Sequence, residues 1–170
     1  MKSAPVTTRK GDNGYTSVSN GARLSKASPL IECLGALDEC NTALGVARAY
    51  LTAKHRYPQV LRHYQQHIYK LMAEVSCRGE KSYFDSRAVK QLEKRIALLR
   101  RRAPVKPVFV TPGDSITGAH LHVARTSVRC AERRLVELLE DELVSSRSAV
   151  PFLNRLSDFL FVLANYVERC

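Results

Sequence analysis

Hydrophobic residues recur every three or four positions along most of this chain, which is the spacing of one face of a helix. The first such run begins at Pro29 and continues to about Leu51. A second run opens at Pro58, because proline is favoured in the first turn of a helix. A third run follows Ser86, a residue type that caps helices, and ends before Pro104.

Two further helices are expected in the last third of the chain. One starts at Asp114 or Ser115 and reaches about Leu143, and the other has Pro151 in its first turn. Strand signals are almost absent. We therefore predict an all-α fold, a five-helix bundle that occupies residues 29–170.

The first 28 residues lack this periodicity and are rich in turn-forming residues. The segment Lys10–Ser17 contains Gly11 and Gly14, and its backbone N–H groups could wrap phosphates. A simple turn is the alternative, because the segment lacks the signature of a phosphate-binding P-loop. We expect residues 1–28 to form an ordered loop or a basic arm within a single domain of residues 1–170.

Composition narrows the classes of partner. The chain has 170 residues, with 27 Lys and Arg against 16 Asp and Glu, so its net charge is +11. Such a charge favours a nucleic acid, an anionic membrane or a phosphate-rich ligand. No apolar run is long enough to cross a bilayer, and the start lacks the apolar region of a secretory signal. Five cysteines without a C-x-x-C pair argue against a disulfide framework or zinc finger and favour a reducing cytosol.

The helix expected after residue 115 carries the sharpest charge pattern. Arg125, Arg129, Glu132 and Arg133 fall at i, i+4, i+7 and i+8, so they share one face. Guanidinium groups stacked in this way repel one another unless an anion or acidic side chains lie opposite. The pattern indicates either a clamp for a polyphosphate or a solvated basic face with one internal Arg–Glu pair.

Polar residues also interrupt the apolar stripes of the first and last helices. Asp38 and Asn41 do so in the first helix, where Asp38 could pair with one of the arginines or lie at a solvated edge. Asn154 and Asp158 are one turn apart in the last helix. They are either polar residues of a functional site or part of the ordinary boundary between the apolar and polar faces of an amphipathic helix.

Two other pairs have suggestive spacing. His63 and His67 have the i, i+4 spacing of a metal-binding pair, but no third ligand is evident nearby, so we predict no metal site. Cys33 and Cys40 are expected to be small core residues.

Five short motifs follow one another along nearly the whole chain. They are T-R-x-G-D-x-G-x-T at Thr8–Thr16, S-K at Ser25–Lys26, G-x-x-D-E-x-N at Gly35–Asn41, L-H-x-x-R-x-x-x-R-x-A-E-R at Leu121–Arg133 and F/Y-L-N-R-L-S-D-x-L-F-x-L-A at Phe152–Ala164. In content and order they resemble the PduO-type ATP:cob(I)alamin adenosyltransferases, also called corrinoid adenosyltransferases.

The resemblance implies a homotrimeric five-helix bundle with active sites between neighbouring subunits. The implied enzyme is an ATP-dependent transferase that moves the 5′-deoxyadenosyl group of ATP to the cobalt of reduced cob(I)alamin. Its products are adenosylcobalamin and triphosphate, and Mg²⁺ is the implied cofactor. The alternative is a non-catalytic relative that binds ATP or adenosylcobalamin as a carrier or sensor.

The resemblance also assigns residues. Those implied in ATP binding are Thr8, Arg9, Lys10, Gly11, Thr16, Ser17, Lys26, Arg129, Glu132, Arg133 and Asn154. Arg129 is also implied in catalysis. Asp38 and Arg125 match a family pair that joins subunits near the site, and Phe109 looks like the aromatic residue of the corrin pocket. Cys130 stands where many relatives carry a second consecutive arginine, so the implied phosphate clamp is one charge lighter.

Partners and location follow from the same resemblance. A corrinoid reductase and an adenosylcobalamin-dependent enzyme are the implied protein partners, in the cytoplasm or inside a bacterial microcompartment. The net charge alone would also suit a nucleic-acid binder, but a helix-turn-helix signature and an aromatic stacking set are lacking. We therefore expect neither a nucleic acid nor a membrane as partner.

Overall fold

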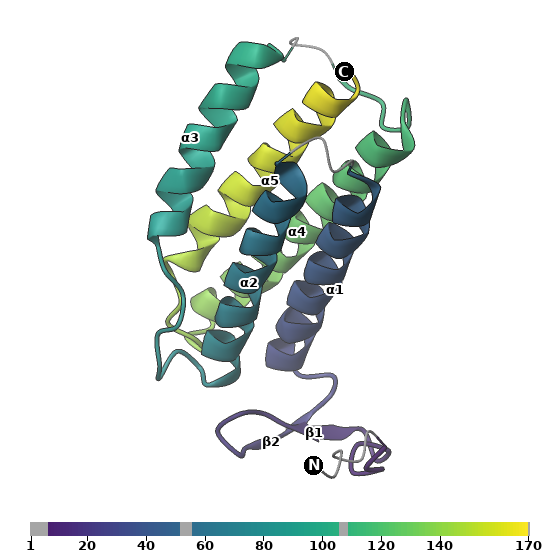
Figure 1. Ribbon diagram of the computed structural model, residues 1–170. Coiled ribbons are helices and arrows are strands. Elements are labelled where there is room, and N and C mark those ends of the chain that lie inside the picture. Colours follow the sequence, from purple (N-terminus) through teal and green to yellow (C-terminus); the bar gives the residue numbers. More distant parts are fainter. Residues whose placement is uncertain (1–6, 52–55, 106–108, 170) are drawn as a thin grey trace, which may run out of the picture.

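Five helices and one short hairpin make up the computed structural model, which describes residues 7–51, 56–105 and 109–169 (Figure 1). The elements are β1 (Tyr15–Ser17), β2 (Arg23–Ser25), α1 (Pro29–Tyr50), α2 (Tyr57–Ser76), α3 (Arg87–Arg102), α4 (Ile116–Glu140) and α5 (Ala149–Val167). The predicted all-α five-helix bundle is confirmed. The fourth helix is shorter than predicted, because it ends at Glu140 rather than at about Leu143.

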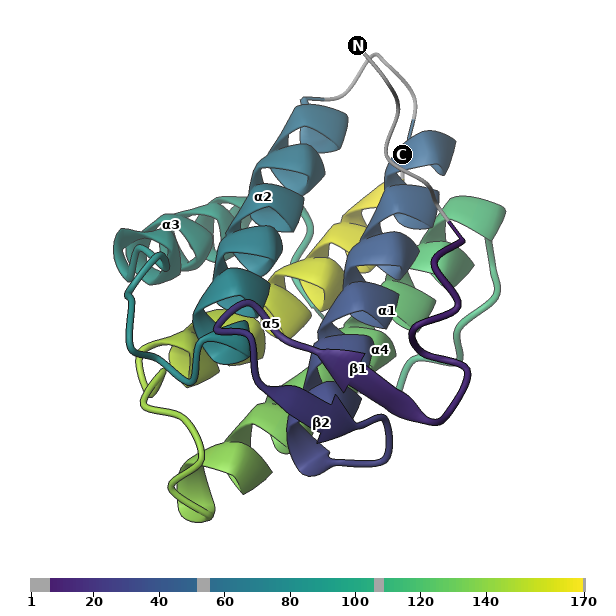
Figure 2. The ribbon, with the colours of Figure 1, turned by 90° about the horizontal axis from the view of Figure 1, so that it is seen from below.

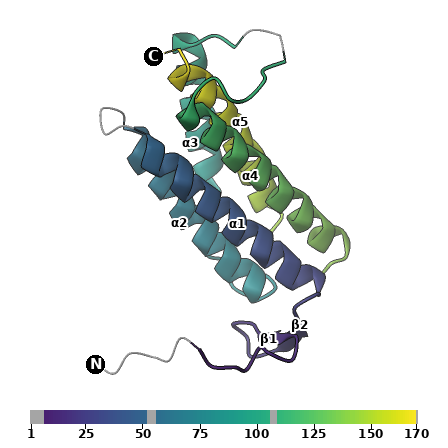
Figure 3. The ribbon, with the colours of Figure 1, turned by 90° about the vertical axis from the view of Figure 1, so that its right-hand side faces the viewer.

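α1 packs against both α2 and α4, α4 packs against α5, and α5 packs against α3, so the helices lie side by side in a bundle (Figures 1 and 3). Aromatic rings join α2 to α5 across the bundle, because the Tyr64 ring lies 6.1 Å from that of Phe152 and 5.8 Å from that of Phe159. All three side chains are fully buried. No helix in the described ranges combines the length and apolar character needed to cross a membrane.

The core takes its side chains from the predicted apolar stripes. Leu37 and Leu44 of α1 are fully buried, and each such side chain stabilises the fold by roughly 1.5–3 kcal/mol. Cys33 and Cys40 are also fully buried, as predicted. Burial raises the pKa of both thiols to about 12, so neither is a reactive thiolate at neutral pH.

The N-terminal segment contains a hairpin that the sequence did not predict. β1 pairs with β2 in antiparallel fashion, with Tyr15 opposite Ser25. The hairpin covers the end of the bundle where α1 begins, and the hydroxyls of Ser19 and Ser76 join it to the last residue of α2 at 2.7 Å (Figure 2). Each strand has three residues, too few for an alternating pattern to show. Residues 1–6 of the predicted loop lie outside the described residues.

The two serines predicted to start helices behave differently. Ser115 caps α4, since its Oγ accepts a hydrogen bond from the Gly118 N–H at 2.9 Å. Asp114, the alternative start, lies one residue before this cap. Ser86 occupies the N-cap position of α3, but its side chain makes no capping hydrogen bond. The Asp85 carboxylate accepts from the Arg87 N–H at 2.9 Å instead.

We predict that Ser115→Ala lowers the free energy of unfolding by about 1 kcal/mol, because it leaves the Gly118 N–H without its acceptor. Ser86→Ala is the matched control, and we expect it to change this free energy by less than about 0.5 kcal/mol. Urea unfolding followed by circular dichroism measures both values. Equal losses in the two variants would show that the capping hydrogen bond contributes nothing.

Candidate functional site

The N-terminal loop brings Lys26 against Gly11. A methyl group at Gly11 would lie 3.1 Å from Lys26 Nζ, tighter than ordinary van der Waals contact, so a larger residue would displace the ammonium group. The Lys26 N–H donates to the Gly14 carbonyl at 2.8 Å, and Gly14 has a φ of +81°, which favours glycine. The loop thus holds the Lys26 ammonium group next to the backbone of Gly11, where a residue with a side chain would push the ammonium group away.

Arg23, which the sequence did not single out, fixes the shape of this loop. Its Nη2 donates to the Lys10 carbonyl at 3.3 Å and to Asn13 Oδ1 at 3.0 Å, and its guanidinium lies 5.9 Å from the Tyr15 ring centre. Arg23 lies in β2, opposite Ser17 of β1. Among the predicted ATP-binding residues of this segment, the exposed ones are Thr8, Arg9, Lys10, Ser17 and Lys26, and the partly buried ones are Gly11 and Thr16.

A second group of predicted residues comes together where α4 lies beside α5. Asn154 Nδ2 donates to Glu132 Oε1 at 3.0 Å, and Arg129 and Arg133 are exposed on the same face of α4. An open cavity of about 340 Å³ is lined by Arg129, Glu132, Arg133, Val136, Glu137, Glu140 and Asn154. The structure therefore groups all four of the ATP-binding residues predicted on these helices.

The arginines of this cavity form no ion pair with Glu132 within the described residues. Among the described residues, neither Arg129 nor Arg133 forms an ion pair, and Arg133 Nη1 instead donates to the Arg129 carbonyl at 3.2 Å. The internal Arg–Glu pair of the solvated-face alternative is thus wrong, because Glu132 binds Asn154. Two guanidinium groups remain available to an anion.

The orientation of Asn154 is set from the side opposite Glu132. Arg155 Nη1 donates to Asn154 Oδ1 at 3.2 Å, and Arg155 Nε donates to Glu93 Oε1 of α3 at 3.3 Å. Arg155 also lies 3.7 Å from Asp158. The contact between Glu93 and Arg155 was not predicted, since these residues are 62 positions apart and no local pattern links them.

Asp38 and Arg125 do not meet within one chain. Asp38 is exposed on α1, while Arg125 on α4 is partly buried and its Nε donates to His122 Nδ1 at 3.3 Å. Of the two alternatives left open for Asp38, pairing with an arginine of the same chain is absent from the described ion pairs. Burial, with a contribution from Arg125, lowers the pKa of His122, which keeps this ring neutral and able to accept.

Phe109 lies far from the N-terminal loop. It is fully exposed and lines an open cavity of about 420 Å³ with Asp114, Asn165 and Glu168. Burial and the nearby Asp114 raise the pKa of the Glu168 carboxyl group. The connection from α3 to α4, which carries Phe109, lies at the end of the bundle opposite the hairpin (Figures 1 and 3). One chain therefore does not bring Phe109 and Gly11 around the same small ligand.

Comparison with curated proteins gives several relatives. The corrinoid adenosyltransferase PduO of Citrobacter freundii is 38% identical over 165 residues, which cover 94% of this chain and 48% of that protein. This chain thus spans about half the length of that relative. The cobalamin adenosyltransferase of Cupriavidus metallidurans is 35% identical over 164 residues, which cover 96% of this chain and 88% of that protein.

Solved structures include two variants of the PduO-type ATP:corrinoid adenosyltransferase of Lactobacillus reuteri. A phenylalanine-to-alanine variant, complexed with cobalamin and ATP, has a TM-score of 0.90 at 27% identity, covering 97% of this chain and 94% of that chain. An arginine-to-lysine variant, complexed with ATP, has a TM-score of 0.88 at 28% identity with the same two coverages.

The sequence model of the cobalamin adenosyltransferase family matches residues 6–167, a span that includes the hairpin, all five helices and both groups of candidate site residues. This chain belongs to the cobalamin adenosyltransferase family.

Proposed function

We propose that this protein transfers the 5′-deoxyadenosyl group of ATP to the cobalt of cob(I)alamin, with release of triphosphate. The observation that carries the proposal is the cavity in which Arg129 and Arg133 lie beside the Glu132–Asn154 hydrogen bond without ion-pair partners among the described residues. The similar fold of an ATP:corrinoid adenosyltransferase complexed with cobalamin and ATP supports it.

The proposed reaction needs no nucleophile from the protein. Cobalt(I) donates an electron pair to the ribose C5′, forming the cobalt–carbon bond, while the C5′–O bond breaks and its electrons leave with triphosphate. The cobalt becomes formally cobalt(III). The tasks left to the protein are to hold C5′ in line with the cobalt and to stabilise the leaving group.

The charged groups of the site suit the stabilisation of the leaving triphosphate. Arg129 and Arg133 are positioned to neutralise the negative charge that grows on triphosphate as the C5′–O bond breaks. Lys26 and the backbone near Gly11 provide further positive charge and N–H donors. Glu132 uses Oε1 for Asn154, so its other oxygen is available to accept from a ribose hydroxyl.

Mg²⁺ is the proposed cofactor. No three side chains of His, Cys, Asp or Glu cluster within the described ranges, so a cage made of protein ligands alone does not fit. Glu140 lines the cavity of Arg129, however, and one or two carboxylates with phosphate oxygens and waters form the usual Mg²⁺ ligand set. We propose that Glu140 would hold Mg²⁺ that arrives with ATP, where the ion would neutralise phosphate charge.

The active unit proposed here is a homotrimer with its sites between subunits. The loop of Gly11 and the connection that carries Phe109 lie at opposite ends of one chain, so a neighbouring copy must bring the two kinds of residue together. α1 and α4, which carry Asp38 and Arg125, also expose four large apolar side chains that a second copy would cover. These are Val46, Tyr50, Ile116 and Val123.

We place the protein in the cytoplasm, because cob(I)alamin forms only under strongly reducing conditions. A corrinoid reductase would supply the cobalt in its reduced state, and an adenosylcobalamin-dependent enzyme would use the product. The main alternative is a non-catalytic carrier or sensor, which the same ATP-binding residues would serve.

An anaerobic assay separates these two functions. It combines the protein with ATP, Mg²⁺ and chemically reduced cob(I)alamin, and follows the visible spectrum of the cobalt–carbon product. We expect protein-dependent formation of adenosylcobalamin with release of one triphosphate for each product formed. ATP binding to a trimer without turnover would overturn the transferase and favour the carrier or sensor.

We predict that Arg129→Ala raises the barrier by about 2–4 kcal/mol, or roughly 30- to 1,000-fold in kcat/KM for ATP, because it removes charge stabilisation from the leaving group. Arg134→Ala is the control, since it removes one charge from the same helix where Arg134 pairs with Glu32 and Glu137. We expect a change of less than about threefold for the control. A parental kcat/KM in Arg129→Ala would exclude the proposed role.

We predict that Phe109→Ala slows the reaction from cob(II)alamin by about tenfold, the effect of losing roughly 1.4 kcal/mol of aromatic contact with the corrin. The affinity for ATP and the thermal midpoint should stay unchanged, because Phe109 is fully exposed in the single chain. Rates with one fixed reductant and ATP titrations measure the two quantities. Equal rates of parent and variant would remove Phe109 from the corrin site.

We predict that Asp38 of one subunit pairs with Arg125 of the next. Asp38→Arg and Arg125→Asp, made singly, should shift the trimer toward monomer, because each leaves two like charges facing each other. The double variant should restore the trimer through a coupling of about 0.5–3 kcal/mol. Sedimentation velocity measures the distribution, and a double variant as dissociated as the single ones would argue against the pair.

A further inference from the structure

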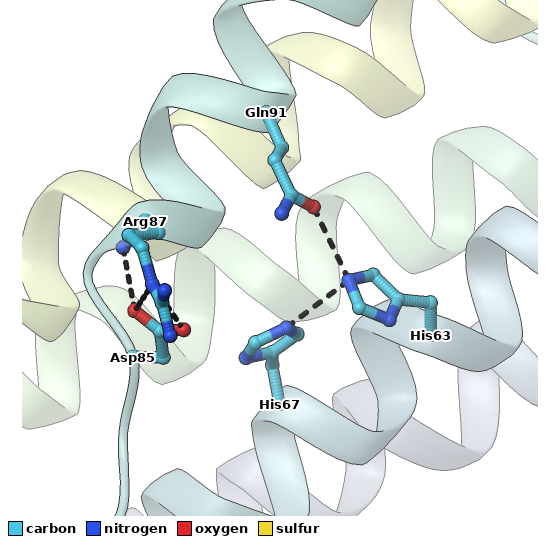
Figure 4. A network of polar contacts seen from close by, with 5 residues as sticks. All are labelled: His63, His67, Asp85, Arg87 and Gln91. Atoms are coloured by element: carbon cyan, nitrogen blue, oxygen red, sulfur yellow. Dashed lines mark hydrogen bonds and ion pairs between the residues drawn. The ribbon is translucent and has the colours of Figure 1, made fainter.

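Two histidines of α2 direct ring nitrogens at each other on the side of the helix that faces α3. His67 Nε2 lies 3.2 Å from His63 Nε2, and the two rings are nearly perpendicular, with an interplanar angle of 83°. The same His63 Nε2 lies 3.3 Å from Gln91 Oε1 of α3 (Figure 4). One ring nitrogen thus has two polar neighbours, a nitrogen from α2 and an oxygen from α3.

Hydrogen bonding alone cannot satisfy this arrangement. An imidazole Nε2 carries either one proton or one lone pair in the plane of the ring, so His63 Nε2 makes at most one good hydrogen bond. It has two neighbours at bonding distance, His67 Nε2 and Gln91 Oε1. A cation between the three atoms would accept a lone pair from each and leave none of them unmatched.

The spacing of the two nitrogens fits chelation. Two imidazole nitrogens, each about 2.0–2.1 Å from a tetrahedral Zn²⁺, lie about 3.3–3.4 Å apart. The two Nε2 atoms of His63 and His67 are 3.2 Å apart, close to the separation in such a zinc site, so the rings would bind a metal ion with almost no movement. Gln91 is exposed and His63 is partly buried, which leaves a path for the ion and for water ligands.

The surroundings of His67 resemble the support that metal-binding histidines receive in proteins. His67 is 7% exposed, and its ring lies against those of Phe84 and Phe152, with centres 6.0 and 5.9 Å away. Its Nδ1 is buried, has no hydrogen-bond partner among the described residues and points toward the paired Asp85 and Arg87 side chains (Figure 4). Metal-bound histidines commonly direct their second nitrogen at a carboxylate.

Burial is the main factor that favours the neutral form of His67. Burial lowers the pKa of His67, and the nearby His63 and Lys70 lower it further, against the opposing effect of Asp85. Asp85 itself is held by Arg87, whose Nε donates to Asp85 Oδ2 at 2.9 Å. A neutral imidazole keeps the lone pair that a metal ion needs.

We propose that His63, His67 and Gln91 form a binding site for a divalent transition-metal ion of the Zn²⁺ class, which ties α3 to α2. Water completes the coordination. Imidazole ligands suit Zn²⁺, Ni²⁺ and Cu²⁺ better than Mg²⁺, so the site is chemically distinct from one that binds Mg²⁺ with ATP. The third ligand escapes a sequence motif because Gln91 is 28 residues beyond His63 and is an amide.

The test uses the full chain without an affinity tag and titrates it with ZnCl₂ by calorimetry. We expect one high-affinity Zn²⁺ ion for each chain and a thermal midpoint that rises with Zn²⁺, but not with MgCl₂. His63→Ala should weaken binding by more than about tenfold, and Gln91→Ala should weaken it by a smaller factor. His120→Ala is the control, because His120 stacks on Tyr50 of α1, far along the chain from this pair, with ring centres 4.5 Å apart.

Hydrogen exchange supplies a second readout that a chance surface ion would not change. Zn²⁺ should slow exchange of the α3 amides in the parent chain and in His120→Ala, and leave them unchanged in His63→Ala. The proposal is overturned if the parent binds no Zn²⁺, if His63→Ala binds it as well as the parent, or if His120→Ala loses it. Circular dichroism checks that the two exposed-side variants, His63→Ala and Gln91→Ala, keep the parental helix content.

Discussion

The hydrogen bond from Asn154 to Glu132 is the contact on which the candidate site depends. It engages one oxygen of the only acidic side chain among the four predicted ATP-binding residues of α4 and α5, and Arg129 and Arg133 have no ion-pair partner among the described residues. A carboxylate paired with a guanidinium would lower the attraction of this face for phosphate. The same hydrogen bond joins α4 to α5. The positions of Arg129 and Arg133 therefore depend on how these two helices pack as well as on the arginine side chains themselves.

Two polar contacts that join α3 to the rest of the bundle reach functional candidates. Glu93 binds Arg155, which in turn holds the amide of Asn154. Gln91, two residues earlier, lies against His63 of α2. Because the helix is otherwise packed mainly on α5, a change in how it docks would act on both pairs of contacts. The position of α3 therefore bears on the orientation of Asn154, although no residue of α3 lines the cavity of Arg129.

Much of the fold could be predicted from the sequence, because a period of 3.6 residues accumulates over helices of 16 to 25 residues. The spacing of Arg129, Glu132 and Arg133 placed them on one face for the same reason. Three-residue strands give no such signal, so the hairpin and the role of Arg23 were missed. Contacts between distant residues, such as Glu93 with Arg155, arise from helix docking and leave no local pattern. The choice of Ser115 over Asp114 as the cap needed the positions of backbone N–H groups.

The single chain has features that only other molecules can complete. Phe109 is fully exposed, and covering a phenylalanine ring is worth roughly 1.5–3 kcal/mol, so a flat apolar surface such as a corrin gains affinity by binding there. Asp38 and Arg125 are charged groups that find no partner in each other within the chain, although α1 and α4 pack together. Assembly through these helices would pair such charges, cover Val46 and Val123, and bring the proposed phosphate-binding end of one copy to the end of another copy that carries Phe109. ATP and cobalamin would then meet only in the assembled protein, which links the proposed activity to the oligomer and not to the folded chain alone.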